Sequence, residues 1–239
     1  MKMNPTMLLP SLLISLVGLT AYASNAEQPP ARVGEAYPLT VCAVTGNPLG
    51  EKPVVVILKD MPKETLNGRE VRFCCGGCKA KFDADPVAAN DKLDEMIVAS
   101  QLPVYPGGNC IVMEDEAMSD PQGPDARRDK NVVIGNRLYR VCCKSCIRRI
   151  KKNPEKYQKI LDDRIKKQQA ASYPLEICVV TGRAYGDTPF EMVVANRLVR
   201  TCCGGCANKV KANPAMAVSQ LNAAHAASKT ESTKETSQS

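Results

Sequence analysis

Residues 69–86 read REVRFCCGGCKAKFDADP, and two further copies of this pattern follow, RLYRVCCKSCIRRIKKNP at 137–154 and RLVRTCCGGCANKVKANP at 197–214. In each copy, two arginines three residues apart precede two adjacent cysteines, and a third cysteine and an Asp/Asn-Pro step follow them. A leading cysteine stands ahead of each copy, and the three leading cysteines are 68 residues apart: Cys42, Cys110 and Cys178. Such a fixed period indicates three copies of one small module.

The repeat uses all twelve cysteines of the chain, and none is left over for another purpose. Four cysteines per module make one recurring thiol-rich site. The candidate metal ligands are therefore Cys42, Cys74, Cys75 and Cys78 in the first module, Cys110, Cys142, Cys143 and Cys146 in the second, and Cys178, Cys202, Cys203 and Cys206 in the third.

The first 26 residues are typical of a cleaved signal peptide. Lys2 precedes an apolar run at 7–19, and small residues follow in Ala21-Tyr22-Ala23 and Ser24-Asn25-Ala26. The run is too short for a membrane span, although an uncleaved anchor is the alternative. We therefore expect a secreted or periplasmic protein without a membrane span, with a signal peptide at 1–26, modules at 27–101, 102–172 and 173–228, and a disordered tail at 229–239.

Each module is expected to contain a β-hairpin followed by two helices. Short apolar runs predict strands at 54–58 and 70–73, at 132–134 and 138–141, and at 191–195 and 197–201. Asn67-Gly68 is a favoured tight turn, because both central residues need a positive φ. Helices are expected at 78–84, 146–152 and 206–212, and each Asp/Asn-Pro step should cap a second helix. These second helices pack on their own hairpin or bridge to the next module.

Because each module is small, it needs a bound metal or covalent cross-links to be stable. A unit of about 60 to 70 residues buries too little surface for comfortable stability alone. The chain is also poor in large aromatic residues, with no Trp and three Phe. Two chemistries qualify, a bound metal ion or disulfide bonds. A structural zinc contributes about 10 to 16 kcal/mol of apparent binding free energy, against roughly 2 to 4 kcal/mol for one disulfide.

The cysteine spacing suits a thiophilic metal. A leading thiolate on a turn can meet thiolates at a hairpin exit and in the first turn of a helix, where free N–H groups stabilise negative sulfur. Four sulfurs in a tetrahedron would make a structural Zn²⁺ site. Three sulfurs would instead suit Cu⁺, which is the alternative.

The first module resembles the TRASH/YHS group of treble-clef-like heavy-metal-binding modules. The resemblance rests on Cys42-x-x-Thr-Gly, on a hairpin that ends in Phe73-Cys74, and on Cys78, Phe82 and Pro86. The second module shows the corresponding Cys142, Cys146 and Pro154-Glu-Lys-Tyr157. The resemblance implies a small α+β fold of three tandem treble-clef-like modules and a role in metal handling or in a metal-stabilised scaffold.

The chain departs from that family in two ways. Thr45, Met113 and Thr181 stand where relatives often carry a second early cysteine. Each module also has an extra cysteine, namely Cys75, Cys143 or Cys203. We infer that this extra sulfur replaces the lost ligand and restores four. The alternative is a buried or redox-active bystander, since adjacent residues do not easily bind the same ion.

Because the protein is expected to be secreted, disulfide bonds are the alternative to a bound metal. Secretion exposes thiols to oxidants, and four cysteines per module allow three pairings. The runner-up function is thus a disulfide-stapled interaction protein without metal. Arg72, Arg140 and Arg200 do not decide the matter, because strand arginines are usually exposed.

Enzymatic activity is not expected. The only histidine, His225, is interpreted as a surface residue of a helix, and no catalytic motif accompanies it. Cys75-Gly-Gly-Cys78 has the spacing of a thiol oxidoreductase without its βαβ surroundings. The net charge is +7, and basic residues concentrate at 144–167. We interpret that segment as a solvated helix face and expect no nucleic-acid partner; a protein partner is unknown.

Overall fold

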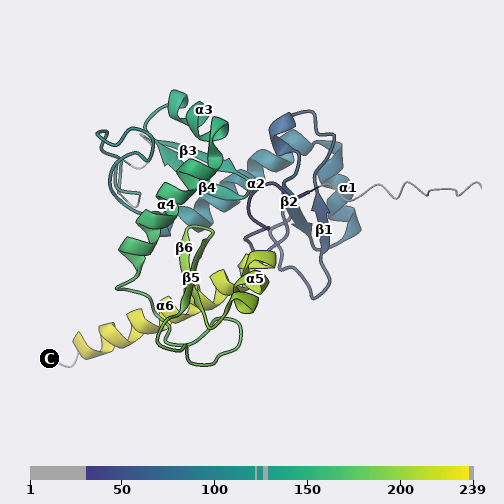
Figure 1. The fold of residues 1–239 in the computed structure, drawn as a ribbon. Helices are drawn as coiled ribbons and strands as arrows, with labels where there is room; N and C mark the ends of the chain where they lie inside the picture. The colour runs from purple at the N-terminus through teal and green to yellow at the C-terminus, as the bar shows by residue number, and fades with distance from the viewer. Residues whose placement is uncertain (1–30, 122, 126–128, 237–239) are drawn as a thin grey trace, which may run out of the picture.

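Three antiparallel hairpins organise the chain. The computed structural model describes residues 31–121, 123–125 and 129–236 (Figure 1). The predicted signal peptide, residues 1–26, lies outside these ranges. The paired strands are β1 (Val54–Ile57) with β2 (Glu70–Phe73), β3 (Lys130–Ile134) with β4 (Arg137–Val141), and β5 (Phe190–Val194) with β6 (Arg197–Thr201). The predicted small α+β architecture of three hairpin-plus-helix units is confirmed.

Two of the hairpins close through the tight turn that their pairing requires. Gly135 and Asn136 have φ values of 53° and 67°, and Ala195 and Asn196 have values of 48° and 59°. Two successive positive φ angles match the right-handed twist of the strands. The prediction of the same turn at Asn67-Gly68 is wrong, because Asn67 has φ −62°. A short 3₁₀ helix, η1 (Glu64–Leu66), occupies this longer connection instead.

Two helices follow each hairpin, as the sequence predicts. The first helices are α1 (Gly76–Ala84), α3 (Lys144–Lys152) and α5 (Gly204–Ala212), and each begins two residues before its predicted start. The second helices are α2 (Pro86–Gln101), α4 (Pro154–Gln169) and α6 (Pro214–Thr236). The Asp85 carboxylate accepts a hydrogen bond from the Ala88 N–H at 3.0 Å, which satisfies a free donor of the first turn of α2.

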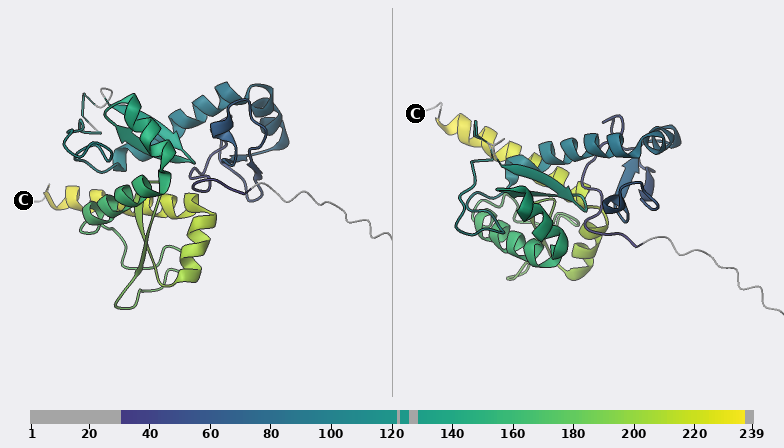
Figure 2. Two further views of the ribbon diagram at one scale, coloured as in Figure 1. Left: turned by 45° about the horizontal axis from the view of Figure 1, so that its top comes forward. Right: turned by 90° about the horizontal axis from the view of Figure 1, so that it is seen from above.

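The C-terminal helix is longer than expected. The backbone of α6 continues to Thr236, through most of the segment predicted to be a disordered tail, and it projects from the rest of the molecule in Figures 1 and 2. No Gly or Pro interrupts the sequence after Pro214, so nothing local ends the helix. Residues 237–239 lie outside the described part of the chain.

The second helix of each of the first two modules packs on the hairpin of the next module. Helix α2 contacts β3 and β4, and α4 contacts β5 and β6 (Figure 2). The Gln101 side chain donates to the Asn136 carbonyl at 3.0 Å and accepts from the Leu138 N–H at 2.9 Å. Gln169 repeats the arrangement with Asn196 and Leu198, at 3.0 and 2.8 Å. Both packing arrangements expected from the sequence hold, because Leu93 and Ile97 of α2 also belong to the core of their own module, and the modules interlock.

Of the three arginines expected to be exposed, Arg140 is buried and Arg72 and Arg200 are half-buried, which corrects the expectation from the sequence. Arg69, Arg137, Arg140 and Arg197 are at most 6% exposed. Arg69 donates through Nε to the Asn136 side chain at 2.8 Å, and Arg137 donates in the same way to Asn196 at 2.8 Å. Each arginine thus reaches the hairpin turn of the following module. Burial follows from this junction, because the next module covers a strand that would otherwise face water.

The N-terminal segment of the first module contacts the hairpin turns of the other two modules. Glu35 donates its N–H to the Gly135 carbonyl at 2.8 Å, while its carboxylate accepts from the Ala195 N–H at 2.7 Å. Gly34 lies so close to Gly135 that a Cβ atom added to Gly34 would stand 2.5 Å from the Gly135 Cα. The absence of a side chain at both positions permits this approach. Residues 32–37 therefore tie the turns of the second and third modules to the first.

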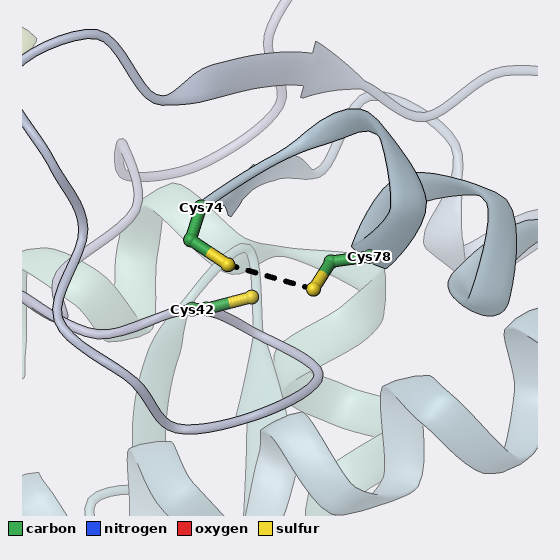
Figure 3. A group of neighbouring side chains, drawn as sticks. All are labelled: Cys42, Cys74 and Cys78. Carbon is green, nitrogen blue, oxygen red and sulfur yellow. Dashed lines mark hydrogen bonds between the residues drawn. The ribbon is translucent and has the colours of Figure 1, made fainter.

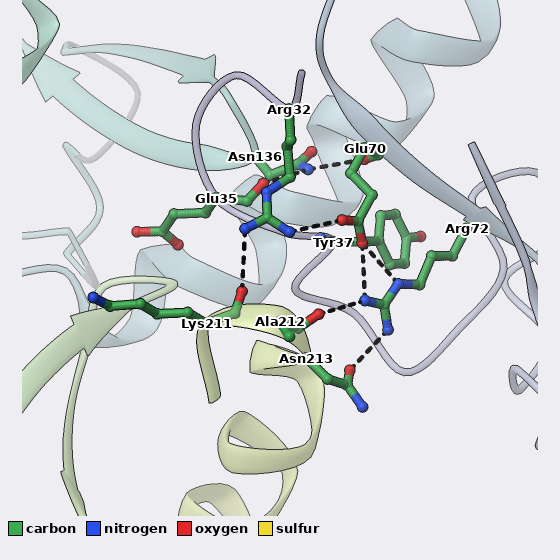
Figure 4. A network of polar contacts seen from close by, with 9 residues as sticks. All are labelled: Arg32, Glu35, Tyr37, Glu70, Arg72, Asn136, Lys211, Ala212 and Asn213. Carbon is green, nitrogen blue, oxygen red and sulfur yellow. Dashed lines mark hydrogen bonds and ion pairs between the residues drawn. The ribbon is translucent and has the colours of Figure 1, made fainter. Parts of the chain in front are cut away.

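The first and third modules also meet directly (Figure 4). Arg72 donates to the Ala212 carbonyl at 2.9 Å and to the Asn213 side chain at 2.8 Å. Arg72 and Arg32 both pair with Glu70, at 2.9 and 3.0 Å. A guanidinium beside the last carbonyls of α5 satisfies acceptors that the helix leaves free and complements its dipole. The three modules accordingly form a closed cluster rather than an extended string.

Within the described residues, none of the helices combines the length and the apolar character that crossing a bilayer requires.

Candidate metal centres

Three cysteines per module meet at one point. The sulfur atoms of Cys42, Cys74 and Cys78 all lie within 4.8 Å of one another (Figure 3). The same holds for the corresponding sulfurs of the other two modules, Cys110, Cys142 and Cys146, and Cys178, Cys202 and Cys206. We call these three groups the cysteine triads. The structure thus brings together nine of the twelve predicted ligands, three from each module.

Local structure places each sulfur of a triad. The leading cysteine opens a tight turn: the Cys42 N–H donates to the Asn47 carbonyl at 2.7 Å, and the Gly46 N–H returns to the Cys42 carbonyl at 2.9 Å. Gly46 has φ 71°, which glycine adopts without strain. Cys74 follows β2 directly, and Cys78 lies in the first turn of α1. A turn, a strand end and a helix start therefore converge, as the spacing predicts.

The sulfur separations fit a bound metal. Cys74 and Cys78 are 3.5 Å apart, and Cys142 and Cys146, like Cys202 and Cys206, are 3.7 Å apart. Four sulfurs at about 2.3 Å from zinc would lie about 3.8 Å from one another in a regular tetrahedron. A disulfide would require about 2.05 Å. All twelve cysteines are free thiols, and none of them pairs at bonding distance.

The extra cysteines stand at the edge of the triads. Cys75, Cys143 and Cys203 are the N-cap residues of α1, α3 and α5, with nearly the same extended backbone in each case. The Cys75 sulfur is 3.7 Å from that of Cys78 and 4.0 Å from that of Cys74. Nevertheless, the set of sulfur atoms that all lie within 4.8 Å of one another contains only the three triad cysteines and leaves out Cys75. Cys75 is also exposed, whereas Cys42 is fully buried.

The leading cysteine of each triad has a lowered pKa, whereas the pKa of the cysteine in the first turn of the helix is raised. Burial alone would raise the pKa of Cys42, but backbone N–H groups of Thr45, Cys74 and Val44 lower it to about 6. Cys178 likewise has a pKa of about 6, since the N–H of Cys202 and the Thr181 hydroxyl outweigh its burial. The neighbouring Cys74 thiol and burial raise the pKa of Cys78 to about 12. A metal ion would supply the positive charge that lets the remaining thiols lose their protons.

The modules differ in the residue that stands where TRASH/YHS modules often carry a second early cysteine. The Thr181 hydroxyl lies 3.8 Å from the Cys202 sulfur, close to the third triad. Met113 occupies the equivalent position of the second module, where it is 43% exposed and its sulfur accepts from Arg149 at 3.3 Å. Its thioether is therefore directed to a guanidinium at the surface.

A first prediction concerns Cys143, whose pKa is lowered to about 6 by the Ser145 hydroxyl at 2.9 Å and by the N–H of Cys146. In metal-free, reduced protein, about 90% of this thiol should be thiolate at pH 7, against about 3% of an ordinary cysteine. Alkylation with iodoacetamide, followed by peptide mapping from pH 5 to 9, should show a midpoint for Cys143 near pH 6.

Ser145→Ala is the matched control for this profile. Loss of the hydroxyl should move the midpoint upward, because a donor that stabilises the thiolate is removed. An ordinary midpoint near 8.5 in the unsubstituted protein would contradict the assignment.

Comparison with models of protein families, with curated proteins and with solved structures finds no match for this chain. The resemblance to TRASH/YHS modules therefore rests on the cysteine pattern.

Proposed function

We propose that this protein binds three thiophilic metal ions, one in each module, and acts outside the cytoplasm in metal handling or as a metal-stabilised scaffold rather than as an enzyme. The observation that carries the proposal is the threefold recurrence of a cysteine triad with sulfur separations of 3.5 to 3.7 Å. Three independent copies of one geometry argue against an accidental cluster. The extracytoplasmic location is proposed from the signal-like sequence at 1–26.

Burial supports a metal at the centre of each triad. Cys42, Cys110 and Cys178 are at most 1% exposed, and the third cysteine of each triad is at most 6% exposed. Three thiols packed together, with the lowered pKa of the leading cysteine, make a site that loses protons when a cation binds. In the first two modules, cysteines of the triad belong to the hydrophobic core, so a metal would link the turn, the hairpin and the first helix that enclose it.

Zn²⁺ is our first candidate, with Cys75, Cys143 and Cys203 as the fourth ligands. Their distances of 3.5 to 4.0 Å from triad sulfurs are close to the edge of a zinc–thiolate tetrahedron. Completing the tetrahedron requires the N-cap sulfur to approach the leading cysteine. Cu⁺ is satisfied by three soft ligands and needs no such movement. The module as a whole would then correspond to the treble-clef-like arrangement that its resemblance to TRASH/YHS modules implies.

The test is elemental analysis of the mature protein isolated from its own compartment, with free thiols counted on the same sample after chelation and denaturation. We expect three zinc ions, or three copper ions, per chain together with twelve thiols. Zinc would favour four-sulfur sites and a scaffold, whereas copper would favour three-sulfur sites and metal handling. A protein with neither metal nor free thiols would overturn the proposal and favour the disulfide-stapled alternative.

A further inference from the structure

The second helices of the modules carry an acidic residue at one repeated position, except in the third module. Asp94 and Asp162 each stand eight residues after the proline that opens α2 or α4, and Asn222 stands at the same place in α6. Arg69 pairs with Asp94 at 2.7 Å, and Arg137 pairs with Asp162 at 2.6 Å. In the third module, Arg197 instead donates to the neutral side chain of Asn222 at 2.9 Å.

The charge of Arg197 is consequently left without a carboxylate. Arg197 is 6% exposed, and no acidic oxygen of the described residues lies within ion-pair distance of it. Its remaining hydrogen bonds are long, at 3.3 Å to the Ser100 carbonyl and 3.4 Å to the Ala195 carbonyl, and its Nε has no partner among the described residues. Burial alone lowers the pKa of Arg197 to about 10, so the side chain is still a cation at neutral pH.

A buried cation of this kind is costly, and a bound anion would offset the cost. The contrast with the second module is informative. Burial would lower the pKa of Arg137, but the charges of Glu35 and Asp162 overcome that effect and raise it. The third module has the corresponding arginine, Arg197, but has Asn222 in place of the acidic residue.

A cavity of about 250 Å³ lies beside Arg197. It is formed where the linker after α2, the end of α4, strand β6 and helix α6 meet. Its lining combines the guanidinium with apolar and aromatic groups, including Tyr105, Tyr173, Leu198, Leu221 and His225. None of the lining residues is acidic. The volume is somewhat below the roughly 300–1,000 Å³ of drug-sized ligand sites, so it suits a small molecule.

We propose that this cavity binds a small organic carboxylate, whose charged group pairs with Arg197 from the cavity side and supplies the negative charge that Asn222 does not. A single guanidinium matches one negative charge, and its planar fork suits a carboxylate. The aromatic and aliphatic lining accommodates an apolar body. This site is separate from the cysteine triads and does not depend on metal binding.

The experiment is calorimetric titration of the full-length mature protein, with its native metal content, using benzoate as the probe and benzamide as its neutral analogue. We expect benzoate to bind and benzamide not to bind. Asn222→Asp supplies the missing carboxylate, so it should weaken benzoate binding by about tenfold or more and raise the melting temperature. Arg197→Gln should abolish binding.

Gln220→Glu is the matched control, because it adds the same charge to the same helix at a residue that, among the described residues, makes no hydrogen bond with Arg197. It should leave benzoate binding within about twofold of the parent, since the added charge does not contact the guanidinium and is screened by salt. Inorganic phosphate serves as a second probe. No binding of benzoate, equal binding of benzoate and benzamide, binding that is unchanged in Asn222→Asp, or binding of phosphate without benzoate would each overturn the proposal.

Discussion

Replacing Cys42 with serine should lower the bound metal from three ions per chain to two. Cys42 is fully buried and contributes the most readily ionised thiol of its triad, so serine leaves a weak ligand at the deepest position. The affinity of the first site should fall by more than about 100-fold, because even loss of a group that only orients a ligand costs 10- to 100-fold. Metal content by mass spectrometry under native conditions gives the result directly.

Cys75→Ser is the paired variant, because it removes a sulfur from the edge of the same site. If zinc is bound with four sulfurs, this variant should also weaken the first site. If copper is bound by the triad alone, it should keep three ions. Retention of three ions with unchanged affinity in Cys42→Ser would contradict a metal site at the triad.

Arg137→Met should destabilise the whole protein more than any single substitution on its surface. Arg137 is 1% exposed and pairs with Asp162 at 2.6 Å and with Glu35 at 3.4 Å, while donating to Asn196 at 2.8 Å. Methionine would leave two carboxylates without their cation, which costs about 3–5 kcal/mol. For a chain of this size, the melting temperature should fall by roughly 6–20 °C in thermal unfolding followed by circular dichroism.

A double variant separates charge from packing. Burial raises the pKa of Glu35 against the influence of Arg137, so a neutral side chain at this position should be tolerated once the arginine is gone. Glu35→Gln combined with Arg137→Met should therefore recover part of the lost stability. Lys159→Met, which removes an exposed pair with Asp163, should change stability by less than about 1 kcal/mol. An equally small effect of Arg137→Met would show that the contacts of Arg137 between the modules contribute little to the stability of the protein.

The sequence alone determined the local units. Strict spacing of the cysteines predicted their convergence, because a turn, a strand end and a helix start are each defined by residues close in the chain. Asp/Asn-Pro steps predicted the breaks between paired helices for the same reason. The Asn67-Gly68 turn was predicted wrongly, because the longer connection in the first module changes how the strands of its hairpin are joined.

Only the tertiary structure decided how the units fit together. A strand arginine looks exposed in sequence, yet Arg137 is buried because α4 and the turn of the third module cover it. The replacement of aspartate by Asn222 is visible in the repeat, but its consequence depends on Arg197 being buried beside a cavity. Local pattern fixes which face of a strand carries a charge, whereas burial depends on surfaces contributed by residues far away in the chain.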